Sequence, residues 1–475
     1  MMRTVSLPMA LTASLLLALP AAAQERPDFS ENVREFISVD APAVLLNYVT
    51  VVDGTGNPAV PDRAVLIENG RITQVGPAGY VRPPDGAEVL ELRGHTVIPG
   101  IVGLHNHTFY TTANRRAQAS VTAPRLYLAS GVTTIRTTGS YHPYAEINLK
   151  RAIETGQEAG PYMHVTGPYI TGPTMSYMTG VETEEEARRV VAYWAEEGAT
   201  WFKFYTRVNR EAARAAIAEA HRRGLKFTGH ICSLSFTEAV ELGIDNIEHG
   251  FFTNTDWDPD KQPDECPPGA LTRLADVEVD GPEVAATIRT MVENDVPMTS
   301  TLAVYELMLP DRPPLEDRVL EALAPEARAE YLATREAIAA RADDSPWTPI
   351  WEKALAFEKA FHDAGGVLAA GVDPTGIGGA LPGFGDQRNY ELLLEAGFAP
   401  LEALRIMTLN GAIVLGEDDQ YGSIEEGKLA NLVVIEGDPV ERPEEIRNVR
   451  MVFREGVGYD PDALIASVQG RVGID

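Results

Sequence analysis

The chain has 475 residues, and its content of 44% hydrophobic and 23% charged residues is ordinary for a globular protein, which excludes a collagen, a coiled coil or a largely disordered chain. It carries 40 Lys and Arg against 69 Asp and Glu, so its formal net charge is −29. This acidity disfavours nucleic acid and anionic membrane surfaces as partners, because binding to phosphate groups needs a basic protein surface.

The N-terminal segment has the pattern of a secretory signal. Arg3 precedes an apolar stretch at residues 11–20, and Ala21–Ala23 offer small residues for cleavage before Gln24. The apolar stretch is too short to span a bilayer. We expect residues 1–23 to be a signal peptide and the mature protein to be exported, periplasmic or secreted, with no membrane span after cleavage. An uncleaved anchor is the alternative, and a homo-oligomer remains open.

Both ends of the remaining chain are rich in predicted strands. Residues 44–95 include a hairpin pattern around Asn69 and Gly70, and residues 431–435 and 449–453 are strand-like. A simple interpretation is one β-sandwich domain built from residues 44–95 and 415–460, with a second domain inserted between its two parts.

The middle of the chain, residues 96–414, alternates short apolar runs with helical patterns, which is typical of an α/β fold with a parallel barrel. The candidate strands are Val97–Val102, Val132–Arg136, Tyr162–Thr166, Thr200–Tyr205, Lys226–His230, Asn246–His249, Met298–Leu302 and Val367–Val372. Two long linkers, 252–281 and 303–348, either cover an active site or are surface insertions without a role.

The chain has two cysteines, Cys232 and Cys266, and no CxxC zinc pattern. Export permits a disulfide, but a domain of this size does not need one. The sequence leaves open whether the two cysteines pair.

Histidines and an aspartate occur at the ends of four candidate strands. His105 and His107 are spaced by two, so on a strand they point to the same side, and neutral imidazole is a common ligand of Zn²⁺. His230 and His249 each end a later strand. Asp373 follows a buried apolar strand, where a carboxylate must find a partner or reach a cleft. It can bind a metal ion, accept a proton, or do both.

Lys203 lies among aromatic residues on another candidate strand, and a buried ammonium group is unfavourable unless it is paired or neutralised. One resolution is reaction with CO₂ to a carbamate, whose two oxygens can bridge two cations. Four imidazoles, one carboxylate and one lysine at the strand ends of a barrel predict a two-metal centre that activates water.

With these motifs the chain resembles the amidohydrolase superfamily, in particular its imidazolonepropionase-like, exported branch. The resemblance extends over about residues 44–460 and includes the segments 51–54, 96–100, 408–412 and 422–433. It implies a distorted TIM (β/α)8 barrel with a small β-sandwich domain formed from both chain ends.

The resemblance also implies the roles of the six residues. His105, His107 and Asp373 resemble the ligands of one metal ion, and His230 and His249 those of the other. Lys203 matches the carboxylated lysine that bridges them. The implied cofactors are two divalent ions, with Zn²⁺ expected and Mn²⁺ or another divalent ion as the alternative. The implied reaction is attack by a metal-bridging hydroxide, with Asp373 moving the proton.

The implied substrate is a small amide such as a dipeptide or an N-acyl amino acid. Tyr205, Arg207, Tyr141 and His142 follow strand ends and are candidates for substrate binding. Two alternatives remain: a lactonase or ester hydrolase with the same metal centre, and a non-catalytic binding protein of the same fold.

Overall fold

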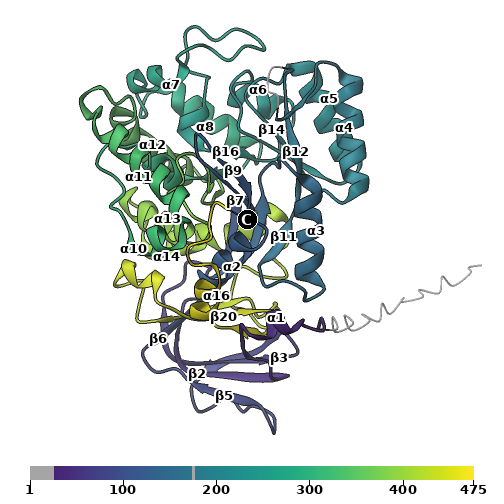
Figure 1. Cartoon of the computed structure of the whole chain (residues 1–475), viewed down its shortest axis with the longest axis vertical. Helices are drawn as coiled ribbons and strands as arrows, with labels where there is room; N and C mark the ends of the chain where they lie inside the picture. The colour runs from purple at the N-terminus through teal and green to yellow at the C-terminus, as the bar shows by residue number, and fades with distance from the viewer. Residues whose placement is uncertain (1–25, 174–176, 475) are drawn as a thin grey trace, which may run out of the picture.

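The computed structural model describes residues 26–173 and 177–474. The predicted signal peptide, residues 1–23, lies outside the described residues. Figure 1 shows a large sheet at the bottom of the molecule, in the purple and yellow of the two chain ends, and above it an α/β domain built from the middle of the chain.

The large sheet has nine strands in the order β1-β21-β20-β19-β6-β2-β3-β4, with β5 beside β2. Its strands are β1 (Ile37–Val39), β2 (Ala43–Val51), β3 (Val60–Glu68), β4 (Arg71–Pro77), β5 (Glu88–Glu91), β6 (His95–Pro99), β19 (Leu432–Glu436), β20 (Val449–Arg454) and β21 (Val457–Tyr459). The two ends of the chain therefore meet in one sheet, where β19 pairs antiparallel with β6. The pairing gives one mixed sheet and does not confirm the predicted sandwich of two sheets.

The hairpin between β3 and β4 forms where the sequence predicts it. Asn69 and Gly70 adopt φ angles of 50° and 81°. Both residue types tolerate this left-handed region, which the tight turn of a twisted hairpin requires.

The α/β domain contains short parallel strands whose side chains are almost all buried, as expected for strands covered on both faces. They form three sheets, in the orders β11-β10-β7, β13-β12-β14-β15 and β16-β17-β18. The strands are β7 (Ile101–Asn106), β10 (Val132–Thr137), β11 (Tyr162–His164), β12 (Thr166–Thr171), β13 (Thr179–Gly180), β14 (Trp201–Phe204), β15 (Lys226–Gly229), β16 (Ile247–Glu248), β17 (Met298–Ser300) and β18 (Leu368–Ala370).

Single backbone hydrogen bonds connect neighbouring sheets. The amide of Tyr169 donates to Ser140, that of Asp245 to Phe227, and that of Asp373 to His105, over 3.4, 3.0 and 2.7 Å. The arrangement is TIM-barrel-like, but no continuous ladder closes a barrel in the described residues.

Most of the helices surround these strands, whereas α1 lies near the large sheet (Figure 1). The helices are α1 (Glu31–Arg34), α2 (Thr122–Ala129), α3 (Pro143–Glu154), α4 (Glu184–Glu197), α5 (Arg210–Arg222), α6 (Phe236–Glu241), α7 (Ala270–Arg273), α8 (Pro282–Glu293), α9 (Leu302–Glu306), α10 (Asp317–Ala322), α11 (Pro325–Ala339), α12 (Thr348–Asp363), α13 (Phe384–Glu395), α14 (Pro400–Met407), α15 (Leu409–Leu415) and α16 (Pro461–Val468). In the part of the chain that the structure describes, none is both long and apolar enough to cross a membrane.

The structure corrects one sequence-based expectation and decides another that was left open. The predicted strand Val97–Val102 is two strands, β6 in the large sheet and β7 in the α/β domain, separated at Gly100. A Cβ at Gly100 would lie 2.1 Å from Oγ1 of Thr133, so glycine allows the close approach of the chain at this crossing. The pairing of the cysteines, left open by the sequence, is settled as a Cys232–Cys266 disulfide.

Candidate metal centre

The six residues predicted to form the site come from the carboxyl ends of five parallel strands. The set comprises His105 and His107 at the end of β7, Lys203 in β14, His230 after β15, His249 after β16 and Asp373 after β18. The carboxyl ends of barrel strands are where active sites of this architecture lie.

Three of these residues form a compact group. His105, His107 and Asp373 each offer one ligand atom within 4.8 Å of the others. Nε2 of His107 lies 3.2 Å from Oδ1 of Asp373, and Nε2 of His105 lies 3.6 Å from its Oδ2. This is the group that the family resemblance assigns to one metal ion.

Lys203 lies beside the same group. Its Nζ is 3.0 Å from Nε2 of His105, and the residue is only 1% exposed. Burial lowers the pKa of Lys203 to about 8. A substantial fraction of the amine is therefore neutral near pH 8.

His230 and His249 lie next to each other, and His249 lies beside His105 of the compact group. Their ring centroids are 4.4 Å apart, and the ring of His249 is also 4.4 Å from that of His105. Nδ1 of His249 is hydrogen-bonded to Oγ1 of Thr301 at 2.8 Å, while its Nε2 is buried without a hydrogen-bond partner among residues 26–173 and 177–474. The structure brings both histidines to the site, and their role as a second pair of ligands remains a prediction.

The protonation states of the cluster suit a cation. Burial lowers the pKa of each of the four histidines, that of His230 to about 3. Burial alone would raise the pKa of Asp373, but interactions with His105 and His107 outweigh it and hold this pKa well below its ordinary value. Neutral imidazoles around an ionised carboxylate are the forms in which these side chains bind metal ions.

A buried carboxylate behind the site was not predicted from the sequence. Oε2 of Glu248 accepts a hydrogen bond from Nδ1 of His105 at 2.7 Å. Arg136 donates to Oε1 of Glu248 at 2.5 Å, and Asn246 and Thr228 also bond to it. The available signal was an acidic residue in the buried strand β16, directly before His249.

The backbone is strained at two of the predicted ligands. His249 and Asp373 have φ angles of 70° and 46°, in the left-handed region that few non-glycine residues adopt. Backbone hydrogen bonds hold both in place, from His249 to Thr299 at 3.0 Å and from Asp373 to His105 at 2.7 Å. The neighbouring strands thus determine how these side chains enter the site.

Two of the predicted substrate-binding residues lie in an aromatic wall next to the histidines. The ring of Tyr205 is 4.7 Å from that of His230, and Tyr141 is 5.1 Å from Tyr169 between ring centroids. Arg207 and His142 are exposed, and in the described part of the chain neither forms a hydrogen bond or ion pair with the six site residues.

Two further aromatic residues of the wall were not predicted. The ring of Tyr305 lies 5.6 Å from that of His249 and stacks on Phe252 at 3.9 Å. Both residues belong to segments that follow strands β16 and β17, where the sequence indicated only long linkers.

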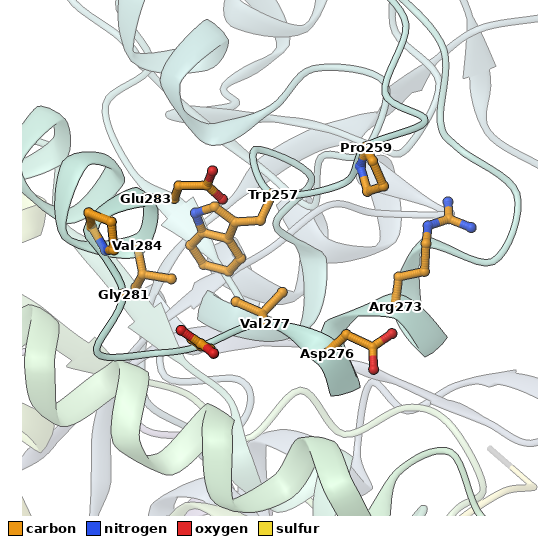
Figure 2. A pocket seen from close by; sticks show the side chains of 10 residues that line it. Trp257, Pro259, Arg273, Asp276, Val277, Gly281, Glu283 and Val284 are labelled. Carbon is orange, nitrogen blue, oxygen red and sulfur yellow. The ribbon is translucent and has the colours of Figure 1, made fainter.

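Two cavities lie in the region of linker 252–281. One, of about 240 Å³, has His230 and the Cys232–Cys266 disulfide in its wall. The other, of about 440 Å³, surrounds Trp257, and none of the six site residues lines it. Figure 2 shows the Trp257 ring between Glu283 and Val277, with Arg273 and Pro259 to one side.

The strand arrangement and the histidine–carboxylate cluster define a class of protein: a TIM-barrel-like fold with a candidate metal centre at the carboxyl ends of its strands. The sequence profile of the amidohydrolase family matches residues 96–458, more than half of the chain. The chain therefore belongs to the amidohydrolase family, and its relatives support a hydrolase acting on carbon–nitrogen bonds.

Curated relatives agree with this family. An imidazolonepropionase from Pseudomonas paraeruginosa is 22% identical over 82% of this chain and 91% of that protein. An adenine deaminase from Chelativorans sp. is 27% identical over 42% of this chain, but the match spans only 33% of that protein. Matches to imidazolonepropionases from Cereibacter sphaeroides and Micrococcus luteus likewise span 16% and 35% of those proteins.

Solved structures share the fold. A structure from Bifidobacterium longum described as a prolidase has a TM-score of 0.66 and 24% identity, covering 90% of this chain and 98% of that one. A Xaa-Pro dipeptidase has a TM-score of 0.66 at 20% identity, covering 88% and 100%. A bottromycin amidohydrolase has a TM-score of 0.70 at 20% identity, covering 93% and 94%. At these identities the similarity concerns the fold alone.

Proposed function

We propose that this protein is a two-metal hydrolase that cleaves the amide bond of a small substrate such as a dipeptide or an N-acyl amino acid. The observation that carries the proposal is the buried group of His105, His107 and Asp373 with Lys203 beside it. The fold similarity to a prolidase and a dipeptidase supports a small amide as the substrate class.

The residues present fit two divalent ions. The donor set is neutral imidazole and carboxylate, which suits Zn²⁺ and also Mn²⁺, and Nε2 of His249 is buried without a partner among the described residues. His105, His107 and Asp373 would hold one ion, and His230 and His249 the other. When bound, such ions activate water and polarise the bond to be cleaved.

Lys203 is proposed to bridge the two ions as a carbamate. Its neutral amine adds to the carbon of CO₂ and loses one proton, which yields an anion with two oxygens. The burial of Lys203 and the 3.0 Å distance from its Nζ to Nε2 of His105 support this role.

Asp373 is proposed to move the proton. As an ionised carboxylate at the edge of the cluster, it would accept a proton from the attacking water and return it to the leaving nitrogen. Tyr205, Arg207, Tyr141 and His142 are proposed to bind the substrate.

We further propose a (β/α)8 barrel with a β-sandwich domain, removal of residues 1–23 and export to the periplasm or medium. Fractionation of cells and the mass of the mature protein test the export. A homo-oligomer is tested by measuring the mass in solution.

A hydrolysis panel tests the function. The protein is loaded with Zn²⁺ or Mn²⁺ and assayed on dipeptides, N-acyl amino acids, lactones and esters. Faster turnover of amides supports the proposal, and preference for lactones or esters favours the second candidate, which the same centre would serve. Bound metal without turnover on any substrate favours a binding protein.

Lys203→Ala tests the bridging role. We expect it to abolish amide hydrolysis and to lower the metal content measured by elemental analysis, because the bridging anion is lost. Added short carboxylic acids should restore part of the activity. Lys150→Ala, at a partly buried lysine on α3 that bonds to Met163 and Glu154, is the control. Normal turnover of Lys203→Ala would refute the bridge.

A further inference from the structure

The cavity beside His230 has a disulfide bond, Cys232–Cys266, in its wall. It has a volume of about 240 Å³ and contacts the predicted metal ligand His230 directly. Its apolar lining includes Ile231, Phe252, Leu271 and Leu274, together with Cys232 and Cys266. An engineered apolar cavity of about 150 Å³ in another protein binds benzene, so this one has room for a side chain of that size.

The same wall contains a polar group without a partner. Asn254 is 3% exposed, and its Oδ1 accepts a hydrogen bond from the amide of Asp256 at 2.7 Å. Its Nδ2 is buried and has no hydrogen-bond partner in the described part of the chain. A buried donor of this kind is costly unless something satisfies it, and a ligand with an acceptor oxygen would do so.

The disulfide connects the outer wall of the cavity to the segment that follows His230. From 258 to 273, only Pro267 is buried, so apolar packing contributes little here. Polar contacts also hold this part of the linker, from Arg273 to Asp258 and from the backbone amide of Arg210 to Asp264. Cys266 is linked to Cys232, two residues after His230, with their Cα atoms 4.9 Å apart. A hydrogen bond from Oγ1 of Thr255 to the carbonyl of Cys232, at 3.1 Å, is a second and weaker connection.

We propose that this disulfide-walled cavity is the pocket that selects the substrate, and that it takes an apolar side chain of an amino-acid unit that carries an acceptor oxygen. This inference rests on the hydrolase function proposed above. The disulfide acts as a positioning device: it holds Pro267 and Leu271 opposite His230, and reduction releases this part of the wall, while Leu274 stays packed in the core.

The test compares amide substrates that differ in one side chain. N-acetylglycine, N-acetylleucine and N-acetylphenylalanine, with the corresponding glycyl dipeptides, are assayed with the metal-loaded, oxidised protein. The readout is the ratio of kcat/KM for the apolar substrate to that for the glycine substrate. We expect this ratio to be about 10 to 100, the range over which an apolar pocket discriminates between side chains.

Two variants change the pocket in different ways. The double variant Cys232→Ser with Cys266→Ser removes the link and should bring the ratio close to 1. Leu271→Trp keeps the disulfide and fills the cavity, so it should also lower the ratio. This variant tests the pocket independently of whether the double variant folds well. Leu315→Trp, at an exposed apolar residue of linker 303–348, is the matched control and should leave the ratio as in the wild type.

Reduction separates the disulfide from other effects of the substitutions. Dithiothreitol should lower the ratio of the wild-type protein but not that of the double serine variant. Because that variant has no disulfide to reduce, it also controls for chelation of metal by the reductant. If amides are hydrolysed and the ratio is unchanged in both pocket variants, the pocket is refuted and the hydrolase function stands. If the metal-loaded wild type hydrolyses no amide, the proposed function fails and this inference fails with it.

Discussion

Glu248 determines which nitrogen of His105 faces the candidate metal centre. Its carboxylate accepts the hydrogen of Nδ1, so the lone pair of the ring is at Nε2, the atom near Asp373 and Lys203. Carboxylates in this position orient metal-binding histidines and increase their basicity. The buried Arg136 in turn compensates the charge of Glu248.

We therefore expect Glu248→Gln to weaken metal binding by about tenfold to a hundredfold, because the amide no longer accepts the hydrogen bond with the strength of a carboxylate. Metal affinity is measured by competition with a chelator. Glu306→Gln is the matched control: Glu306 is equally buried, and it pairs with Arg312 and Arg388. An unchanged metal affinity in Glu248→Gln, with the fold intact, would show that Glu248 has no orienting role.

At the scale of the elements, the site depends on the contact between β18 and β7. Gly371 follows β18, and a Cβ there would lie 2.2 Å from the backbone nitrogen of His105. No L side chain fits this distance without moving one of the strands. The contact brings Asp373 next to the two histidines of β7, although 266 positions separate it from His107 in the chain.

Gly371→Ala should consequently destabilise the protein by about 1–3 kcal/mol, the usual cost of overpacking, and should reduce its metal content. Thermal unfolding and elemental analysis measure the two effects. Gly86→Ala also adds one methyl group, with nothing within 4 Å of it. Its φ of 85° strains an alanine, so this variant controls for a loss of stability away from the site and should leave the metal content unchanged. If Gly371→Ala binds metal normally, the strand contact does not position the ligands.

At the scale of the whole molecule, buried acids link the stability of the fold to pH. Burial raises the pKa of Glu358 to about 8, and its Oε2 has no hydrogen-bond partner among the described residues. Below pH ~4.5 the carboxyl is protonated in both the folded and the unfolded chain. Between ~4.5 and ~8 only the folded state keeps the proton, so the free energy of unfolding decreases as the pH rises through this window.

Glu358→Gln should remove this part of the pH dependence, because glutamine does not ionise. We expect the variant to unfold at a higher temperature than the wild type at pH 8 and at a similar temperature at pH 5. Calorimetry of both proteins at the two pH values measures the difference. Burial also raises the pKa of Glu146 and Asp386, but these groups are present in both proteins and do not affect the comparison. Parallel pH profiles for the two proteins would contradict the prediction.

The residues of the candidate site could be selected from the sequence because their chemistry depends on residue type and on position at a strand end. The alternation of side chains on a strand already places His105 and His107 on one side. The same patterns indicated that both chain ends are rich in strands and that an α/β domain lies between them.

The tertiary structure alone determined the contacts that depend on close packing between distant segments. The role of Glu248, the pairing of Cys232 with Cys266 and the division of Val97–Val102 between two sheets belong to this group. Local patterns report which face of an element is apolar, whereas hydrogen bonds, disulfides and strand crossings depend on where another part of the chain lies in space. For that reason the types of the site residues followed from the sequence, and their geometry came only with the fold.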